Sequence, residues 1–131
     1  MSGQTLPSTE RMRRRPDFER AHNEGARVHG RFMTVFVLPN GGTVARLGVA
    51  ATRKIGSSVD RNRAKRLARE IFRRQKLAQP GFDIVVVPRR EMLDASFVNL
   101  ESDYQTALKR ASRAGGSSSG PRRDRRRPRP A

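Results

Sequence analysis

The 131-residue sequence contains no cysteine, which excludes a disulfide framework and a thiolate metal site. It also lacks a run of about 18 apolar residues, the length that a membrane-spanning helix needs. No signal-peptide pattern opens the chain. We therefore expect a cytoplasmic protein that does not act on a membrane.

Residues that could form a catalytic centre are also scarce. A nuclease acting alone needs a general acid and base, or clustered metal ligands. The chain has two histidines, His22 and His29, and no HExxH motif. Glu101 and Asp103 are close in sequence but point to different sides of a predicted helix. Three N-terminal acids lie among arginines and balance charge locally: Asp17, Glu19 and Glu24. We expect no catalytic residue and no protein-bound metal.

Negative charge is in short supply, with 12 acidic against 29 basic residues and a net charge of +17. Such an excess destabilises a compact chain unless a polyanion neutralises it, and nucleic acid or an anionic membrane could do so. Of the basic residues, 25 are arginines. Arginine suits forked contacts to phosphate, although a G+C-rich genome explains the ratio of arginine to lysine equally well. The genome does not explain the positive excess.

The apolar residues gather between positions 32 and 108, which predicts one domain with a modest core. Residues 1–15 are predicted to be a flexible basic arm, and residues 16–113 the folded domain. Residues 114–131 form a Gly/Ser linker and an Arg/Pro-rich tail, which we expect to be disordered without a ligand.

The first half of the domain is predicted to contain a short helix from Asp17 to Gly25 and two strands. Segments 31–38 and 43–52 flank the breaker at 39–42, which predicts a β-hairpin with a loose turn. One face of the second strand is apolar, with Leu47, Val49 and Ala51. The other carries Arg46, Gly48, Ala50 and Thr52. A face of small residues is either solvated or leaves room for a ligand, and this strand alone favours the solvated reading.

The second half is predicted to be helix, strand, helix. A helix over residues 60–78 ends at Pro80-Gly81, and its N-cap is Ser57, Ser58 or Asp60. The segment 82–88 has the composition of a fully buried strand. A last helix starts near Ser96 and has one apolar side: Phe97, Leu100, Tyr104, Leu108 and Ala111.

The helix at 60–78 separates apolar from basic residues. Its apolar stripe consists of Ala64, Leu67, Ala68, Ile71, Phe72 and Gln75. The opposite arc, about 100° wide, carries Asn62, Lys65, Arg66, Arg69, Arg73 and Lys76. Like charges one turn apart on a helix repel by a few tenths of a kcal/mol. A face that is only solvated would therefore carry both positive and negative side chains. A helix that reads base edges usually carries Asn, Gln or Ser among its cations, and Asn62 is the only such residue on the arc. The arc therefore favours contact with phosphates and a folded shape.

Two adjacent stretches, RLGVAATRKIGSSV and RNRAKRLAREIF, resemble the bacterial ribonuclease P protein component. The family hallmark is a G-x-small-small-x-(R/K)-K-I-G strand and loop followed by an Arg-Asn-Arg helix, here residues 48–56 and 61–63. The likeness extends more weakly from Phe18 to Arg113. It implies a two-layer α/β (α+β) sandwich in the order α-β-β-β-α-β-α. The sheet is mixed and ribosomal-protein-like, with a left-handed βαβ crossover. This order needs a fourth strand, which we expect from a bend or split within residues 43–52.

The resemblance also implies a function. The protein would join a catalytic RNA that, with Mg²⁺ held mainly by the RNA, removes the 5′ leader of precursor tRNA. It would be a monomer in a one-to-one complex with ribonuclease P RNA. Expected contacts to the catalytic RNA are Arg53, Lys54, Arg61, Asn62, Arg63, Lys65, Arg66, Arg69 and Arg73. Expected contacts to the leader are Phe18, His22, Phe36 and Arg46.

His22 stands where many relatives have a second aromatic residue, and an imidazole offers less area for stacking. The resemblance also implies that the face of the second strand with small residues forms the floor of the leader cleft. The alternative is a structural RNA-binding protein of ribosomal type that makes no contact with a substrate.

Overall fold

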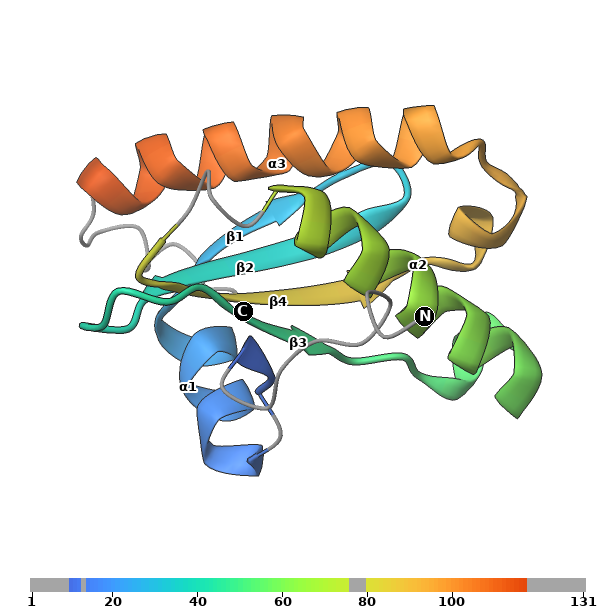
Figure 1. The fold of residues 1–131 in the computed structure, drawn as a ribbon, viewed down its shortest axis with the longest axis horizontal. Helices are drawn as coiled ribbons and strands as arrows, with labels where there is room; N and C mark the ends of the chain where they lie inside the picture. Colours follow the sequence, from blue (N-terminus) through green and yellow to red (C-terminus); the bar gives the residue numbers. More distant parts are fainter. Residues whose placement is uncertain (1–9, 13, 76–79, 118–131) are drawn as a thin grey trace, which may run out of the picture.

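A computed structural model describes residues 10–12, 14–75 and 80–117 as three helices on a four-stranded sheet (Figure 1). The order α-β-β-β-α-β-α agrees with the prediction. The elements are α1 (Arg15–Glu24), β1 (Ala26–His29), β2 (Met33–Pro39), β3 (Arg46–Val49), α2 (Ser58–Gln75), β4 (Phe82–Pro88) and α3 (Phe97–Ser117). Two short 3-10 helices, η3 (Arg53–Ile55) and η5 (Arg90–Asp94), precede α2 and α3.

The strand order is β1-β2-β4-β3, so the predicted hairpin between segments 31–38 and 43–52 is wrong. β4 lies between β2 and β3, antiparallel to the first and parallel to the second. The physical reason is burial. β4 is the strand of continuous apolar character, and a central position covers both of its edges and both of its faces.

The fourth strand is β1, not a split of residues 43–52. It pairs antiparallel with β2, from Ala26 opposite Val37 to His29 opposite Thr34. The tight hairpin of the fold is therefore the β1–β2 connection. The Asp103 carboxylate of α3 stabilises that turn, because it accepts hydrogen bonds from the backbone N–H groups of Arg31 and Phe32, both at 2.9 Å.

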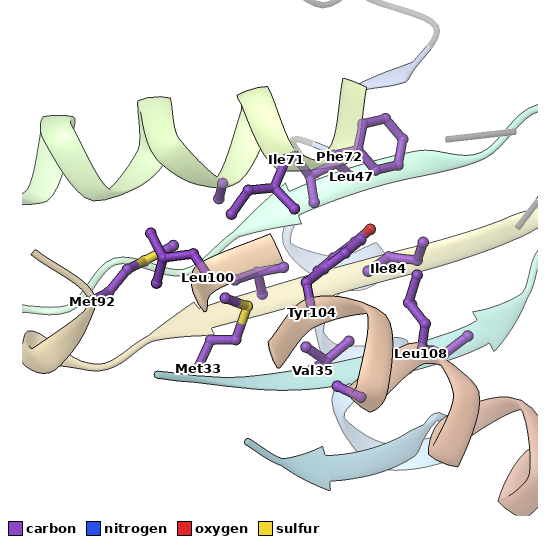
Figure 2. Close-up of a cluster of buried hydrophobic side chains, with 14 of the residues drawn as sticks. Met33, Val35, Leu47, Ile71, Phe72, Ile84, Met92, Leu100, Tyr104 and Leu108 are labelled. Carbon is purple, nitrogen blue, oxygen red and sulfur yellow. The ribbon is translucent and has the colours of Figure 1, made fainter. Parts of the chain in front are cut away.

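The main core lies between the sheet and the helices α2 and α3 (Figure 2). Figure 2 shows side chains of α2 and α3 in this layer together with side chains of β2, β3 and β4. Its fully buried members include Met33, Ile71, Phe72, Ile84 and Tyr104. α2 and α3 occupy one face of the sheet, and the opposite face packs against α1 (Figure 1) and Met12 of the N-terminal segment.

The apolar stripe predicted for α2 is confirmed. Ala64, Ala68, Ile71 and Phe72 are buried, so the basic arc faces away from the core. Ser57 is the N-cap: its hydroxyl accepts from Asp60 N at 3.2 Å, and the Asp60 carboxylate accepts from Ser57 N at 3.3 Å. This reciprocal pair is a capping box.

Gly56 sets the angle at which the chain enters α2. Its φ is +142°, a conformation that residues with a Cβ atom rarely adopt. The glycine of the K-I-G motif therefore has a backbone role. The predicted stop at Pro80-Gly81 follows residues 76–79, which lie outside the described residues, as does Lys76 of the basic arc.

The two ends of the domain differ from the predicted boundaries in detail. Met12, inside the predicted arm, is buried, and its N–H donates to Leu47 O at 2.8 Å. At the other end α3 is described to Ser117, past the predicted start of the linker at residue 114. The tail from residue 118 lies outside the described residues.

Candidate nucleic-acid interface

A cleft of about 380 Å³ lies between α1 and the free face of the sheet. Three predicted leader contacts meet in it: Phe18 and His22 from α1, and Phe36 from β2. Spacing explains the first two, because residues four apart in a helix lie on one face. The remaining lining residues are Arg15, Glu19, Asn23, Ala50, Val85 and Val87.

The cleft is an aromatic surface with a cation at its edge. The rings of His22 and Phe36 have centroids 4.9 Å apart and are inclined by 32°. The guanidinium of Arg27 lies over the Phe36 ring, 5.4 Å from the ring centroid. Such a surface can stack bases and attract the phosphates that join them. Arg27 was missed from the sequence because its strand, β1, was missed.

The small face of β3 is covered by α1. A Cβ atom at Gly48 would lie 2.6 Å from Phe18 Cζ and 3.1 Å from Met12 Cβ. Gly48 therefore lets the Phe18 ring sit directly on the sheet, while Ala50, just beyond β3, lines the cleft. The reading of this face as solvated is wrong for Gly48, because the residue is buried.

The fourth predicted leader contact, Arg46, is engaged within the protein. Its Nε and Nη2 donate to the Asp83 carboxylate at 2.8 and 2.7 Å, and its Nη1 lies 3.7 Å from Asp17 Oδ2. Arg46 and Asp83 are register partners on the parallel strands β3 and β4. Arg46 is absent from the residues that line the cleft. Its position favours a role in holding α1 on the sheet.

Asp83 is completely buried, and its environment keeps it ionised. Burial opposes ionisation, but hydrogen bonds from Arg46 and from Asn40, the latter at 3.0 Å, outweigh it and lower the Asp83 pKa. The same hydrogen bond raises the pKa of Arg46 against the effect of burial. A carboxylate in an otherwise apolar strand was the sequence signal for this pair, since a buried charge needs a partner.

The predicted contacts to the catalytic RNA lie on one continuous stretch of chain. Asn62, Arg63 and Arg66 are exposed on α2, and Arg53 and Lys54 are exposed on η3. Four others on α2 are partly buried: Arg61, Lys65, Arg69 and Arg73.

Two of these partly buried arginines have partners inside the protein. Arg73 Nη2 donates to both oxygens of Glu70, at 2.6 and 2.7 Å. Arg61 Nη1 donates to Gly56 O at 3.1 Å, which ties the first turn of α2 to the preceding loop. Lys65 and Arg69 instead line a second, smaller pocket next to Phe18.

No group of three or more His, Cys, Asp or Glu side chains that could hold a metal ion occurs among the residues that the structure describes. Within the same ranges, no helix is long and apolar enough to cross a membrane.

Comparisons with known proteins agree on one family. The family model described as ribonuclease P matches residues 6–112, a range that begins before the predicted limit of the resemblance at Phe18. The ribonuclease P protein component of Oleidesulfovibrio alaskensis is 42% identical over 106 residues, 79% of this chain and 84% of the relative. That of Thermotoga maritima is 44% identical over 84 residues, 63% of this chain and 72% of the relative.

Solved structures have the same fold. The ribonuclease P protein from Thermotoga maritima matches with a TM-score of 0.69 at 39% identity, over 77% of this chain and 96% of that chain. The Staphylococcus aureus protein matches with a TM-score of 0.69 at 30% identity, over 78% of this chain and 94% of that chain. Sequence motif, fold and both kinds of comparison converge, and the chain belongs to the ribonuclease P protein family.

Proposed function

We propose that this chain is the protein subunit of a ribonuclease P holoenzyme that binds both the catalytic RNA and the 5′ leader of precursor tRNA. The observation that carries the proposal is the cleft lined by Phe18, His22 and Phe36, in a chain that also presents exposed cations on α2. One surface suits single-stranded bases and the other suits a folded phosphate backbone. Such a complex acts on tRNA precursors, so we place it in the cytoplasm.

The cleft would hold the leader mainly by stacking. The His22–Phe36 pair presents ring faces and edges, and base–aromatic stacking is worth about 1–3 kcal/mol per base without demanding a sequence. Arg27 and Arg15 would add phosphate contacts at the rim. Mature tRNA has no leader and gains none of these contacts.

The α2 arc would position the catalytic RNA. Its exposed residues Asn62 and Arg66, together with Arg63, Arg53 and Lys54 outside the arc, contribute charge and hydrogen-bond donors, which screen the repulsion between two RNA backbones. We assign bond cleavage and the Mg²⁺ ions to the RNA partner in a one-to-one complex. The protein's own residues then bind and orient.

The leader contact can be tested by affinity. In the complex with ribonuclease P RNA, precursor tRNA should bind more tightly than mature tRNA, by about tenfold or more. The double change Phe18→Ala and Phe36→Ala should remove most of this difference, as measured by equilibrium binding of both tRNAs. Phe97→Ala is the matched control, because Phe97 is a partly buried phenylalanine on α3, against the other face of the sheet.

The same measurement decides between the two candidate functions. Equal affinity of the unmodified complex for precursor and mature tRNA would contradict leader binding. The alternative would then stand, namely a structural RNA-binding protein of ribosomal type. Circular dichroism of the variants shows whether the fold is kept, since Phe36 is itself buried.

A further inference from the structure

The edge strand β1 carries a part of the sheet's free face that the cleft does not include. Its residues alternate between partly buried and exposed, and Arg27 and His29 are the exposed pair. The register with β2 places Arg27 opposite Phe36. His29 is opposite Thr34. Because side chains two apart on a strand point to one face, Arg27 and His29 lie on the same side of the sheet as Phe36. The surface that begins in the cleft therefore continues over β1.

Phe36 supports this surface but is hardly accessible itself, since it is only 4% exposed. The His22 ring of α1 lies next to it, with 4.9 Å between the ring centroids. The Arg27 guanidinium lies over its ring, 5.4 Å from the centroid. Both of these neighbouring side chains are exposed. A nucleotide that approaches from solvent therefore meets the imidazole and the guanidinium before it meets the phenyl ring.

Arg27 is oriented by the protein without being neutralised. Among the residues that the structure describes, no carboxylate forms an ion pair with it. Its contact with Phe36 is a cation–π interaction, which leaves the N–H groups of the guanidinium available. A guanidinium can stack on a base with its face and donate to a phosphate with its edge.

His29 offers a second planar group on the same strand. Its Nδ1 lies 3.1 Å from Thr34 Oγ1, and this hydrogen bond restrains the ring. Burial, followed by the charges of Arg27 and Arg89, lowers the pKa of His29. The imidazole is therefore neutral at pH 7, and a neutral imidazole can stack on a base. Arg27 and His29 together are named the β1 strip.

We propose that the β1 strip is a second binding site for single-stranded RNA, which holds leader nucleotides that extend past the cleft of Phe18, His22 and Phe36. The base of one nucleotide stacks on the Arg27 guanidinium, and His29 contacts the adjoining nucleotide. Positive charge and planar groups match a single strand, which offers phosphates and unstacked bases together. A folded RNA helix keeps its bases paired and would gain only phosphate contacts. The role of the strip rests on the proposed function, because the strip takes up the leader where the cleft ends.

The test separates charge from shape at Arg27. In the complex of the full-length protein with ribonuclease P RNA, Arg27→Lys keeps the charge and loses the planar group. It should lower the affinity for precursor tRNA about fivefold, because stacking on a base is lost, and leave the affinity for mature tRNA unchanged. Because Arg27 is exposed, the fold should be kept.

Arg31→Lys is the matched control. The Arg31 guanidinium lies over the Phe32 ring, 5.5 Å from its centroid, but Phe32 packs against the main core on the other face of the sheet. This variant should leave the affinity for precursor tRNA unchanged. Equal losses with Arg27→Lys and Arg31→Lys, or a loss of affinity for mature tRNA as large as that for precursor tRNA, would overturn the strip.

Abasic nucleotides separate stacking from phosphate contact. A leader that lacks the base on Arg27 should bind the unmodified complex about fivefold more weakly, and Arg27→Lys should then weaken it no further. If the two losses multiply at every leader position, Arg27 contacts a phosphate and not a base, and the stacking is contradicted.

Leader length locates the strip. The affinity should rise with each added nucleotide until the cleft and the strip are both filled. The double variant Arg27→Lys and His29→Ala should remove the last steps of this rise and keep the first ones, which belong to the cleft. Loss of all the steps together would contradict a separate site on β1.

Failure of the strip is distinguishable from failure of leader binding. Equal affinity of the unmodified complex for precursor and mature tRNA would overturn both. A clear preference for precursor tRNA that Arg27→Lys leaves unchanged would overturn the strip alone.

Discussion

Asp83 places a carboxylate inside the sheet, opposite its register partner Arg46 on the neighbouring strand. Arg46 reaches on to Asp17 of α1, so these three residues connect β4, β3 and the helix that forms one wall of the cleft. Removing one member of a buried ion pair leaves the other charge without compensation. The pair therefore matters for stability and for the position of α1.

Asp83→Asn should lower the free energy of unfolding by about 3 kcal/mol at neutral pH. Because the Asp83 pKa is lowered in the folded state, the ionised carboxylate stabilises the fold above the ordinary value of 3.8. This stabilisation is lost as the pH falls below 3.8. The difference in free energy of unfolding between the variant and the unmodified protein should therefore become smaller in that range. Urea denaturation at neutral and acidic pH measures it.

Asp94→Asn is the control, since Asp94 is exposed on η5 and should change stability little. If the difference in free energy of unfolding between Asp83→Asn and the unmodified protein stays constant down to pH 2, the assignment of an ionised Asp83 is contradicted.

Gly48→Ala tests the close contact of α1 with the sheet. The new Cβ atom would displace the Phe18 ring, at a cost of about 1–3 kcal/mol in stability. If the proposed leader binding holds, the preference for precursor over mature tRNA should fall by a larger factor than stability alone explains. Equilibrium binding of both tRNAs measures this ratio of affinities. Gly42→Ala is the control: its Cβ atom would meet only Asn40 Oδ1, at 3.3 Å. An unchanged tRNA preference would show that the ring position is unimportant.

At the scale of elements, α2 divides its cations into two kinds. Arg66 is exposed, whereas Arg73 is neutralised by Glu70 three residues earlier. The helical wheel placed both in one arc and did not distinguish them. A cation that is already paired with a carboxylate of the protein displaces fewer counterions from the RNA than an unpaired one.

Arg66→Ala should therefore reduce the slope of log affinity against log salt by about one ion for ribonuclease P RNA. Arg73→Ala should reduce it less, because Glu70 already competes for that guanidinium. Binding measured at several salt concentrations gives both slopes. An unchanged slope for Arg66→Ala would mean that this side of α2 does not face the RNA.

The elements themselves were largely predictable from local sequence. The helix from Asp17, the basic helix and the strand 82–88 carry strong local signals, namely a breaker at one end and a clear periodicity. The strand β1 was missed because its sequence, ARVH, is short and half polar. The hairpin error has another cause. Nothing within residues 31–52 reveals that a strand more than thirty positions later lies between the two segments.

The candidate site was predicted in part, for a related reason. Phe18 and Phe36 match the family pattern, and His22 stands at the position of its second aromatic residue. The structure brings the three together in the cleft. The internal role of Arg46 depends on Asp83, which lies 37 positions away. Arg11 was assigned to a flexible arm, because a two-residue docking segment has no periodicity to detect.

At the scale of the whole molecule, the positive charge is divided between the domain and the C-terminal tail. Residues 118–131 contain six arginines and one acid, and the net charge of the chain is +17. Such a basic segment attracts a polyanion over a distance of about one Debye length, roughly 10 Å at 0.1 M salt. We therefore expect the tail to affect the rate of association more than the arrangement of the bound state.

Removing residues 118–131 should slow association with ribonuclease P RNA at low salt, by about tenfold, and the difference should vanish at high salt. Stopped-flow binding measures the rates. Processing of precursor tRNA at ample Mg²⁺ should be unchanged. Loss of processing under those conditions would show that the tail has a specific role.

The Phe18 side chain lines both the cleft and the smaller pocket that contains Arg11, Lys65 and Arg69. Two ligands that contact the same side chain are thermodynamically coupled when either one changes the conformations that this side chain adopts. If filling the smaller pocket fixes the Phe18 ring and thereby raises leader affinity by some factor, the leader must raise the affinity for the pocket's ligand by the same factor. Binding in one cavity would thus change the affinity of the other through a single aromatic side chain.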